Sequence, residues 1–381
     1  MLTALTFIAV LYLPFLLFLT KGWKIALLIR SDTPPAQYPD VTVVVAARNE
    51  EDNIAVLLDD LKCQTTRNFQ VVVVDDHSED KTVTIAKAFH DNPTYSLDVV
   101  SMDAAGGKKA AITTGIRRAR GSVVITTDAD CRPGRRWIES MLASFHPHVK
   151  FVSGGVRIGP AETFRAHLQS LEFSSLVGTG ASTIGLGWPT MCNGANMAFR
   201  RDAFIEVGGY SGNDHIASGD DVFLMQKIHA RYPGSVVFCP QTSAVVETGP
   251  VAWRDFIDQR IRWGAKWKYA ATAATPTLAW FVGLFHLSWL VLVPATVLNG
   301  AVIEPLLLFL VKAIFEMAYL RKVHRFLGAK WSWRAFALLQ LTYSAYVVTM
   351  GALANFKTPA WKGRKIRRTA VEIHSSLADN R

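Results

Sequence analysis

The sequence predicts an α/β protein in which one soluble sheet domain lies between membrane helices. Hydrophobic residues make up 50% of the 381-residue chain, a high share for a soluble protein. They are unevenly spread, because residues 1–20 and 269–303 contain no Asp, Glu, Lys or Arg. Between these two regions, strand-like and helix-like patterns alternate from residue 41 onward. These observations favour a membrane protein with a soluble insert.

Residues 1–30 are predicted to form an uncleaved transmembrane helix. No cation precedes the apolar run, whereas Lys21, Lys24 and Arg30 follow it. A secretory signal has its basic residues first, so the order here argues against one. The positive-inside rule then places the following domain in the cytoplasm of a multi-pass protein of the cell membrane.

Residues 40–248 are predicted to form a soluble domain on a parallel, Rossmann-like sheet. The strings VTVVVAA, FQVVVVDD and SVVITTDAD contain continuous β-branched runs, which are typical of strands buried on both faces. Between the first two, Ile54, Leu57, Leu58 and Leu61 recur at helical spacing. Alternation of this kind indicates parallel strands joined by crossover helices.

Polar side chains follow three of these strands at the points where the strands end. In chain order they are Arg48, Asn49, Glu50, Asp75, Asp76, Asp128 and Asp130. Ligands of such sheets bind outside the carboxyl ends of the strands, so this edge is the expected site. The chain contains neither G-x-G-x-x-G nor a P-loop sequence there. The Asp-x-Asp pair instead predicts a Mg²⁺ or Mn²⁺ ion that bridges to a diphosphate.

Several motifs, in this order, resemble those of glycosyltransferase family 2, the inverting enzymes with the GT-A fold. They are VVVAARNEEDNI, VVVVDDHSEDKT, GGKKAAITTGI, TTDADC, GANMAFRRDAFIEVGGY, SGDDVFL and QRIRW. The resemblance covers roughly residues 40–268. It implies a GT-A nucleotide-sugar-binding domain, whose donor is a UDP-sugar.

The resemblance also implies roles for individual residues. It predicts that the donor is bound at the sheet edge by Ala47, Glu50, Asp75, Asp76, Lys108 and Asp128. Asp128 and Asp130 would hold the metal, and Asp221 would be the general base. The family often has Thr-Glu-Asp at the base, where this chain has Gly219-Asp220-Asp221, so Asp220 stays a second candidate. Capping of the following helix is the structural alternative for both aspartates.

Residues 249–272 are predicted to form an interfacial helix with the Gln-x-x-Arg-Trp motif. Gln259, Arg262 and Trp263 share one helical face at i, i+3 and i+4. If the sheet holds UDP at its strand ends, Arg262 would face the diphosphate and Trp263 would form the acceptor-side wall of the site. The other basic and aromatic residues of this stretch, Arg260, Trp267 and Lys268, are expected at the bilayer boundary.

Residues 273–356 are predicted to form the C-terminal membrane region. Residues 277–297 and 301–320 would cross and return, with Lys312 paired to Glu316 one helical turn away. Residues 335–356 either cross the membrane, re-enter it as a hairpin or lie along the interface. The last two options keep the basic tail, residues 357–381, on the cytoplasmic side.

The sequence therefore predicts a membrane glycosyltransferase that transfers a sugar from a UDP-sugar to a lipid hydroxyl. The layout resembles that of ceramide-glucosyltransferase-like members. Two alternatives stay open: a small processive polysaccharide synthase with a glycan acceptor, and a non-catalytic sugar-nucleotide sensor. The net charge of +10 is concentrated beside apolar segments, so membrane lipids are the expected partner of these cations and nucleic acid is not.

Overall fold

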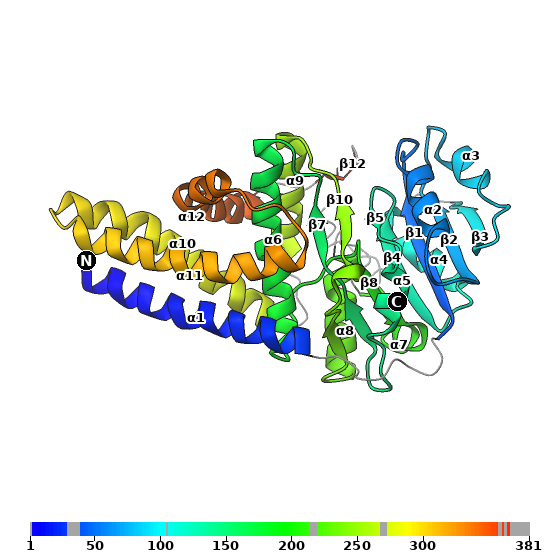
Figure 1. Cartoon of the computed structure of the whole chain (residues 1–381), viewed down its shortest axis with the longest axis horizontal. Helices are drawn as coiled ribbons and strands as arrows, with labels where there is room; N and C mark the ends of the chain where they lie inside the picture. The colour runs from blue at the N-terminus through cyan, green and yellow to red at the C-terminus, as the bar shows by residue number, and fades with distance from the viewer. Residues whose placement is uncertain are drawn as a thin grey trace, which may run out of the picture.

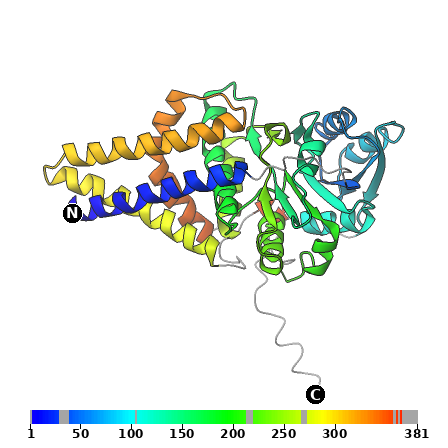
Figure 2. The same ribbon diagram turned by 60° about the horizontal axis from the view of Figure 1, so that its bottom comes forward.

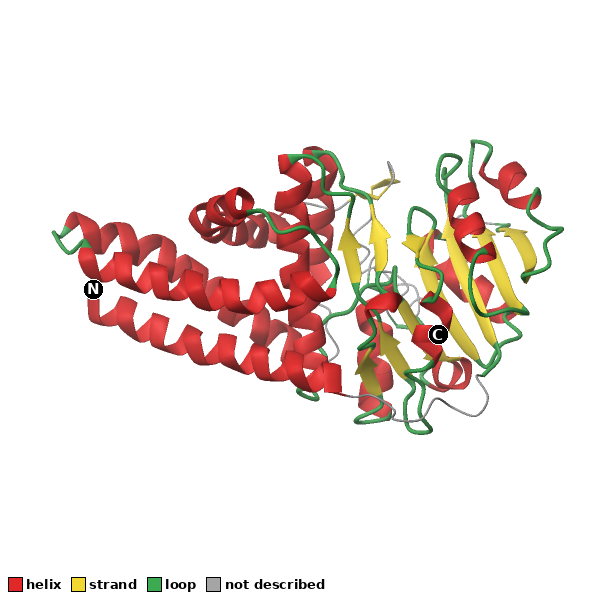
Figure 3. Ribbon diagram, viewed as in Figure 1, coloured by secondary structure: helices red, strands yellow, loops and turns green. Residues whose placement is uncertain are grey.

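The computed structural model describes residues 2–28, 39–103, 106–212, 219–266, 273–356, 360–361 and 364–365. Figure 3 shows its two halves: helices alone on one side, and a mixed helix and strand domain on the other. The predicted α/β class with a GT-A-like sheet and long apolar helices is confirmed.

A seven-stranded sheet forms the centre of the mixed domain. In spatial order its strands are β3 (Tyr95–Ser101), β2 (Phe69–Asp75), β1 (Val41–Ala47), β4 (Val123–Asp128), β8 (Met197–Arg200), β6 (Phe151–Ser153) and β9 (Val236–Phe238). The first four are parallel, as predicted, whereas β8 is antiparallel to both β4 and β6. The continuous β-branched runs therefore predicted the longer strands β1, β2 and β4, whereas β6, β8 and β9, which are also buried, are only three or four residues long.

Helices cover both faces of the sheet because alternate strand residues point to opposite sides. Val43 and Val45 pack with α2 (Ile54–Lys62) and α5 (Trp137–Leu142). Val44, from the same strand, packs on the other face with α4 (Gly107–Arg118) and α8 (Asp220–Arg231). Three short helical elements complete the domain: α3 (Thr82–Lys87), α7 (Arg201–Glu206) and η1 (Thr242–Ala244).

A small second sheet connects the central sheet with the helical half (Figure 1). It contains β5 (Arg132–Pro133), β10 (Val246–Thr248) and β7 (Val156–Ile158). Two helices follow β7 and β10 in the chain: α6 (Phe164–Gly185) and α9 (Trp253–Gly264). Near the C-terminus, β11 (Ala360–Trp361) pairs with β12 (Arg364–Lys365).

Three long helices lie side by side and extend away from the sheet: α1 (Leu2–Leu28), α10 (Ala274–Leu298) and α11 (Ile303–Phe326). The turn between α10 and α11 lies at the same far end as the N-terminus (Figures 1 and 2). By contrast, α12 (Trp333–Phe356) runs across this bundle (Figure 2). By length and apolar character, α1, α10 and α12 could each cross a membrane.

A polar network holds α12 against the bundle. Lys312 Nζ lies 2.8 Å from Glu316 Oε2, as the sequence predicted. Tyr12 of α1 donates a hydrogen bond to Glu316 Oε1 (2.7 Å), and Gln340 of α12 donates one to Glu316 Oε2 (2.8 Å). One turn further along α12, Ser344 Oγ lies 3.0 Å from His286 Nδ1 of α10. The buried Lys312 and Glu316 of α11 are thus paired inside the bundle, as buried charges must be in an apolar surrounding.

Candidate functional site

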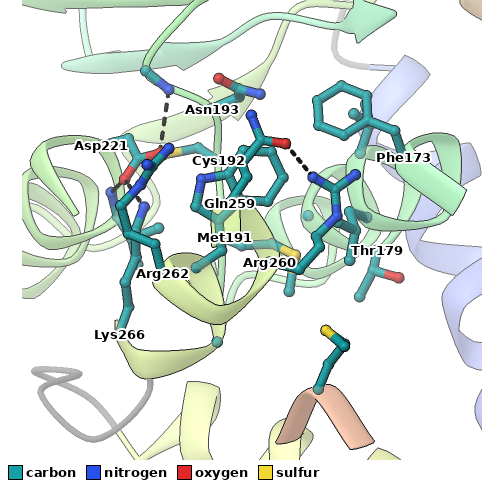
Figure 4. Close-up of a pocket in the computed structure, with 18 of the residues that line it drawn as sticks. Phe173, Thr179, Met191, Cys192, Asn193, Asp221, Gln259, Arg260, Arg262 and Lys266 are labelled. Carbon is teal, nitrogen blue, oxygen red and sulfur yellow. Dashed lines mark hydrogen bonds and ion pairs between the residues drawn. The ribbon is translucent and has the colours of Figure 1, made fainter. Parts of the chain in front are cut away.

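One cavity of about 1200 Å³ extends from the carboxyl edge of the central sheet to the first half of α10 and the second half of α12. The sheet end is lined by charged side chains and the helix end by apolar ones. Between them lie α9, α6 and the loop that precedes β8 (Figure 4). We call these two regions the polar end and the apolar end of the cavity.

The carboxyl ends of β1, β2 and β4 lie side by side at the polar end because these parallel strands end at paired residues. Ala46 of β1 lies opposite Asp128 of β4, and Ala47 lies opposite Asp75 of β2. The predicted residues that line the cavity here are Ala47, Glu50, Asp76, Lys108, Asp128 and Asp130. Asp75 is not among the cavity-lining residues. Its buried carboxylate accepts hydrogen bonds from the backbone N–H of Ser78. Asp75 therefore stabilises the turn that follows β2.

The Asp-x-Asp pair has the donor chemistry of a divalent-cation site. Asp128 Oδ1 lies 2.6 Å from Lys108 Nζ. Burial, together with the carboxylates of Asp128 and Glu50, raises the pKa of Asp130 to about 6. A bound cation would relieve this repulsion, so the residues fit such an ion. Among the described residues, no third Asp, Glu, His or Cys completes a metal-binding group. Diphosphate oxygens and water are the remaining ligands that such an ion would take.

Asp221, the predicted base, lies on the cavity wall at the start of α8. Its carboxylate is held in place: Oδ1 accepts from the Val222 N–H at 2.7 Å, and Oδ2 accepts from the Gly194 N–H at 3.3 Å. Gly219 precedes it with a φ of 86°, and a Cβ there would lie 2.5 Å from the Phe223 ring. The chain therefore needs glycine at this turn. The side chain of Asp220, the second candidate, lies outside the described residues.

Lys266 is a cavity residue that the sequence reasoning missed. Its Nζ lies 3.1 Å from Asp221 Oδ1, and both side chains are largely buried. Burial is the largest single influence and would raise the pKa of Asp221. The charge and hydrogen bond of Lys266, the Val222 N–H and the charge of Lys108 together outweigh burial and lower that pKa below its usual value. Lys266 follows Gln259 by seven residues, so the helical spacing that grouped Gln259, Arg262 and Trp263 could have found it.

The three predicted residues of α9 all line the cavity. Arg262 points toward Asp221, and Gln259 lies between that cluster and Phe173 of α6 (Figure 4). The Trp263 ring packs against Phe173 with their centroids 5.8 Å apart. The motif thus places one cation near the candidate base and one aromatic ring on the wall of the cavity.

Arg260 does not lie at the bilayer boundary, and that prediction is wrong. Its side chain is buried in a salt bridge with Glu172 of α6, with Nε 2.9 Å from Oε1. Its guanidinium also stacks on Phe256 and Trp263. Tyr346 of α12 donates a hydrogen bond to the same Glu172 oxygen at 2.9 Å. Arg260 therefore ties α9 to α6 and α12. Trp267 and Lys268 lie outside the described residues.

The parallel sheet and its acidic edge are those of a domain with the GT-A fold. Residues 42–208 match the family described as Glycosyl transferase family 2, so the predicted resemblance to that family is confirmed for this part of the chain. The match indicates the predicted enzyme class, a glycosyltransferase.

Similar proteins agree with this assignment. The chain is 28% identical over 190 residues to the glycosyltransferase AglE of Haloferax volcanii, a match that covers 48% of this chain and 59% of that protein. It is 24% identical over 217 residues to a poly-β-1,6-N-acetyl-D-glucosamine synthase of Staphylococcus aureus, covering 56% and 52%. The matched part is thus little more than half the length of these relatives.

A solved structure with the same fold is that of a mannosyltransferase from Pyrobaculum calidifontis in complex with GDP-Man and Mn²⁺. It aligns with a TM-score of 0.56 and 23% identity, over 93% of this chain and 94% of that one. At this identity the likeness shows the fold.

Proposed function

We propose that this protein is a membrane glycosyltransferase that transfers a sugar, with inversion, from a UDP-sugar to a lipid hydroxyl. One observation carries the proposal: a single cavity joins the carboxylate edge of the sheet to the helices that are apolar enough to enter a membrane. A polar donor and an apolar acceptor can then meet inside one site.

The donor would bind at the polar end. Glu50, Asp76 and Lys108 line the part of the cavity beside β1, where the resemblance places the nucleotide. UDP is the nucleotide that the family motifs favour. The mannosyltransferase of similar fold was solved with GDP-Man, so a GDP-sugar is the competing donor.

Asp128 and Asp130 would hold Mg²⁺ or Mn²⁺. Such an ion neutralises negative charge on a diphosphate leaving group. The raised pKa of Asp130, caused by burial and by the carboxylates of Asp128 and Glu50, supports this role because a cation would relieve both influences.

Asp221 would act as the general base. In the proposed reaction the acceptor hydroxyl oxygen forms a bond to the anomeric carbon while the bond from that carbon to the diphosphate breaks on the opposite side. The hydroxyl proton passes to the Asp221 carboxylate, and UDP leaves with the electron pair. Arg262 would stabilise the charge that develops on the departing phosphate. The lowered pKa of Asp221 keeps it ionised and able to accept the proton at neutral pH.

We further propose that the sheet domain is cytoplasmic and that α1, α10 and α11 cross the membrane. Lys21, Lys24 and Arg325 lie at the sheet end of their helices, whereas Glu304 lies next to the far turn. This distribution follows the positive-inside rule. Because α12 runs across the bundle, we place it along the interface, with the basic tail on the cytoplasmic side.

Processive polysaccharide synthesis is the second candidate, because one relative is named a poly-β-1,6-N-acetyl-D-glucosamine synthase. The decisive experiment supplies purified protein with a panel of UDP- and GDP-sugars, divalent metal and extracted membrane lipids. We expect release of UDP and one labelled product that is soluble in organic solvent. A ladder of oligomers would favour the synthase. Absence of nucleotide release with every donor, although the protein binds them, would favour the sensor.

A further inference from the structure

The apolar end of the cavity is bounded by one face of α10 and one face of α12. On α10 the cavity-lining residues include Trp280, Gly283, Leu284 and Leu287, at i, i+3, i+4 and i+7. On α12 they include Tyr343, Val347, Met350 and Gly351 in a similar stripe. Since such stripes mark single helix faces, the two helices present these faces to a shared cleft.

Contacts at both ends of the α12 stripe fix this cleft. At one end, Ser344 bonds to His286 of α10. At the other, α12 packs closely on α9, because a Cβ at Gly264 would lie 3.0 Å from the Ala354 Cβ. Between these contacts the helices are separated by open space: a Cβ added at Gly283 or at Gly351 would meet no atom within 4 Å.

The cleft is open sideways as well as toward the sheet. Leu284 and Leu287 line the cavity, yet they are 53% and 44% exposed. They belong to α10, a helix long and apolar enough to span a membrane. With α10 crossing the membrane as proposed, an opening lined by exposed leucines faces hydrocarbon, so a lipid can enter it without passing through water.

We infer that the cleft between α10 and α12 is the binding site for the hydrocarbon chain of the acceptor lipid, and that Gly283 and Gly351 set its width. This inference rests on the proposed lipid acceptor. It adds the route by which the hydrocarbon chain enters the cavity and the residues that limit the width of its binding site. The chain lies between the two helix faces, and its hydroxyl head reaches Trp263 and Asp221 at the other end of the cavity.

The test uses the full chain in lipid nanodiscs with a diacylglycerol that carries a diazirine in one acyl chain. After irradiation, mass spectrometry locates the adducts. We expect them on the stripes of α10 and α12 that face the cleft. Adducts confined to the outward face of α11, at Leu306 and Leu310, would overturn the inference.

Variants sharpen the test. In Gly283→Phe/Gly351→Phe the added rings fill the open space, and we expect about tenfold fewer cleft adducts, which corresponds to a loss of about 1.4 kcal/mol of lipid binding. Leu306→Phe/Leu310→Phe is the matched control, because both leucines are exposed on α11. UDP binding reports whether the sheet domain is intact. If Gly283→Phe/Gly351→Phe fails to fold, the positions of the adducts in the unaltered protein still test the inference.

Two results separate this inference from the proposed function. Adducts in the cleft without sugar transfer from any donor would support the chain site and refute the transferase reaction. Transfer to lipid at an unchanged rate in the folded Gly283→Phe/Gly351→Phe protein would refute the chain site and leave the reaction standing.

Discussion

The two ends of the cavity differ in how the chain builds them. The polar end comes from strand ends and the residues just after them, so short local strings contain most of its side chains. The apolar end combines residues of α10 and α12 that lie about sixty positions apart. Chemistry at the first depends on individual charges, whereas binding at the second depends on the space between two helices. Changes at the polar end should therefore have the larger effects on rate.

The largest expected effect is that of Asp221→Asn. Loss of a general base lowers rates by about 10²–10⁴-fold, and we expect transfer to fall within that range while UDP binding is retained. Initial rates of UDP release with saturating acceptor measure it. Asp220→Asn is the matched variant, since both aspartates are candidates. If Asp220→Asn abolishes transfer and Asp221→Asn does not, the base is assigned to the wrong residue.

Arg262→Ala should lower transfer by about 10²–10³-fold, because a preorganised charge at the leaving group is lost. Arg325→Ala, which removes an exposed cation at the end of α11, should leave the rate unchanged. Membrane insertion, measured by flotation with liposomes, should be normal in both proteins. If Arg262→Ala fails to insert, the residue anchors the helix to the bilayer and does not serve the diphosphate.

Removal of divalent metal should lower the rate about a hundredfold, as the loss of several kcal/mol of charge stabilisation implies. Addition of Mg²⁺ or Mn²⁺ after chelation should restore it in the unaltered protein. In Asp130→Asn the same addition should restore little. Equal recovery in both proteins would mean that the metal does not depend on Asp130.

The sequence predicted the parallel strands and their acidic edge because β-branched runs and the residues after them are local signals. It could not predict the antiparallel β8, whose four residues contain no distinctive periodicity. Glu172 was also missed, because its partner Arg260 lies 88 positions away and only the packing of α6 on α9 brings them together. A basic residue beside a membrane helix favours a lipid contact on composition alone, which is why Arg260 was placed wrongly.

The smallest expected effect, and the most specific, concerns Lys266. This lysine and Lys108 lower the pKa of Asp221 against the effect of burial, and Arg262 faces the same carboxylate. Lys266→Met leaves the burial and removes the largest favourable charge, so the pKa of Asp221 should rise. The acid limb of the pH–rate profile should then move to higher pH, because the carboxylate is protonated over more of the acidic range.

Lys266→Met should consequently lose more activity at pH 5 than at pH 8, whereas Lys266→Arg, which keeps the charge, should retain the original limb. An equal loss at every pH would mean that Lys266 only shapes the cavity wall. A shifted limb would instead show that Lys266, just after α9, tunes the base on α8 directly. The segment from α9 to Lys266 would then serve both steps of the proposed reaction: Trp263 would contact the acceptor, and Lys266 would set the pKa of the base that takes its proton.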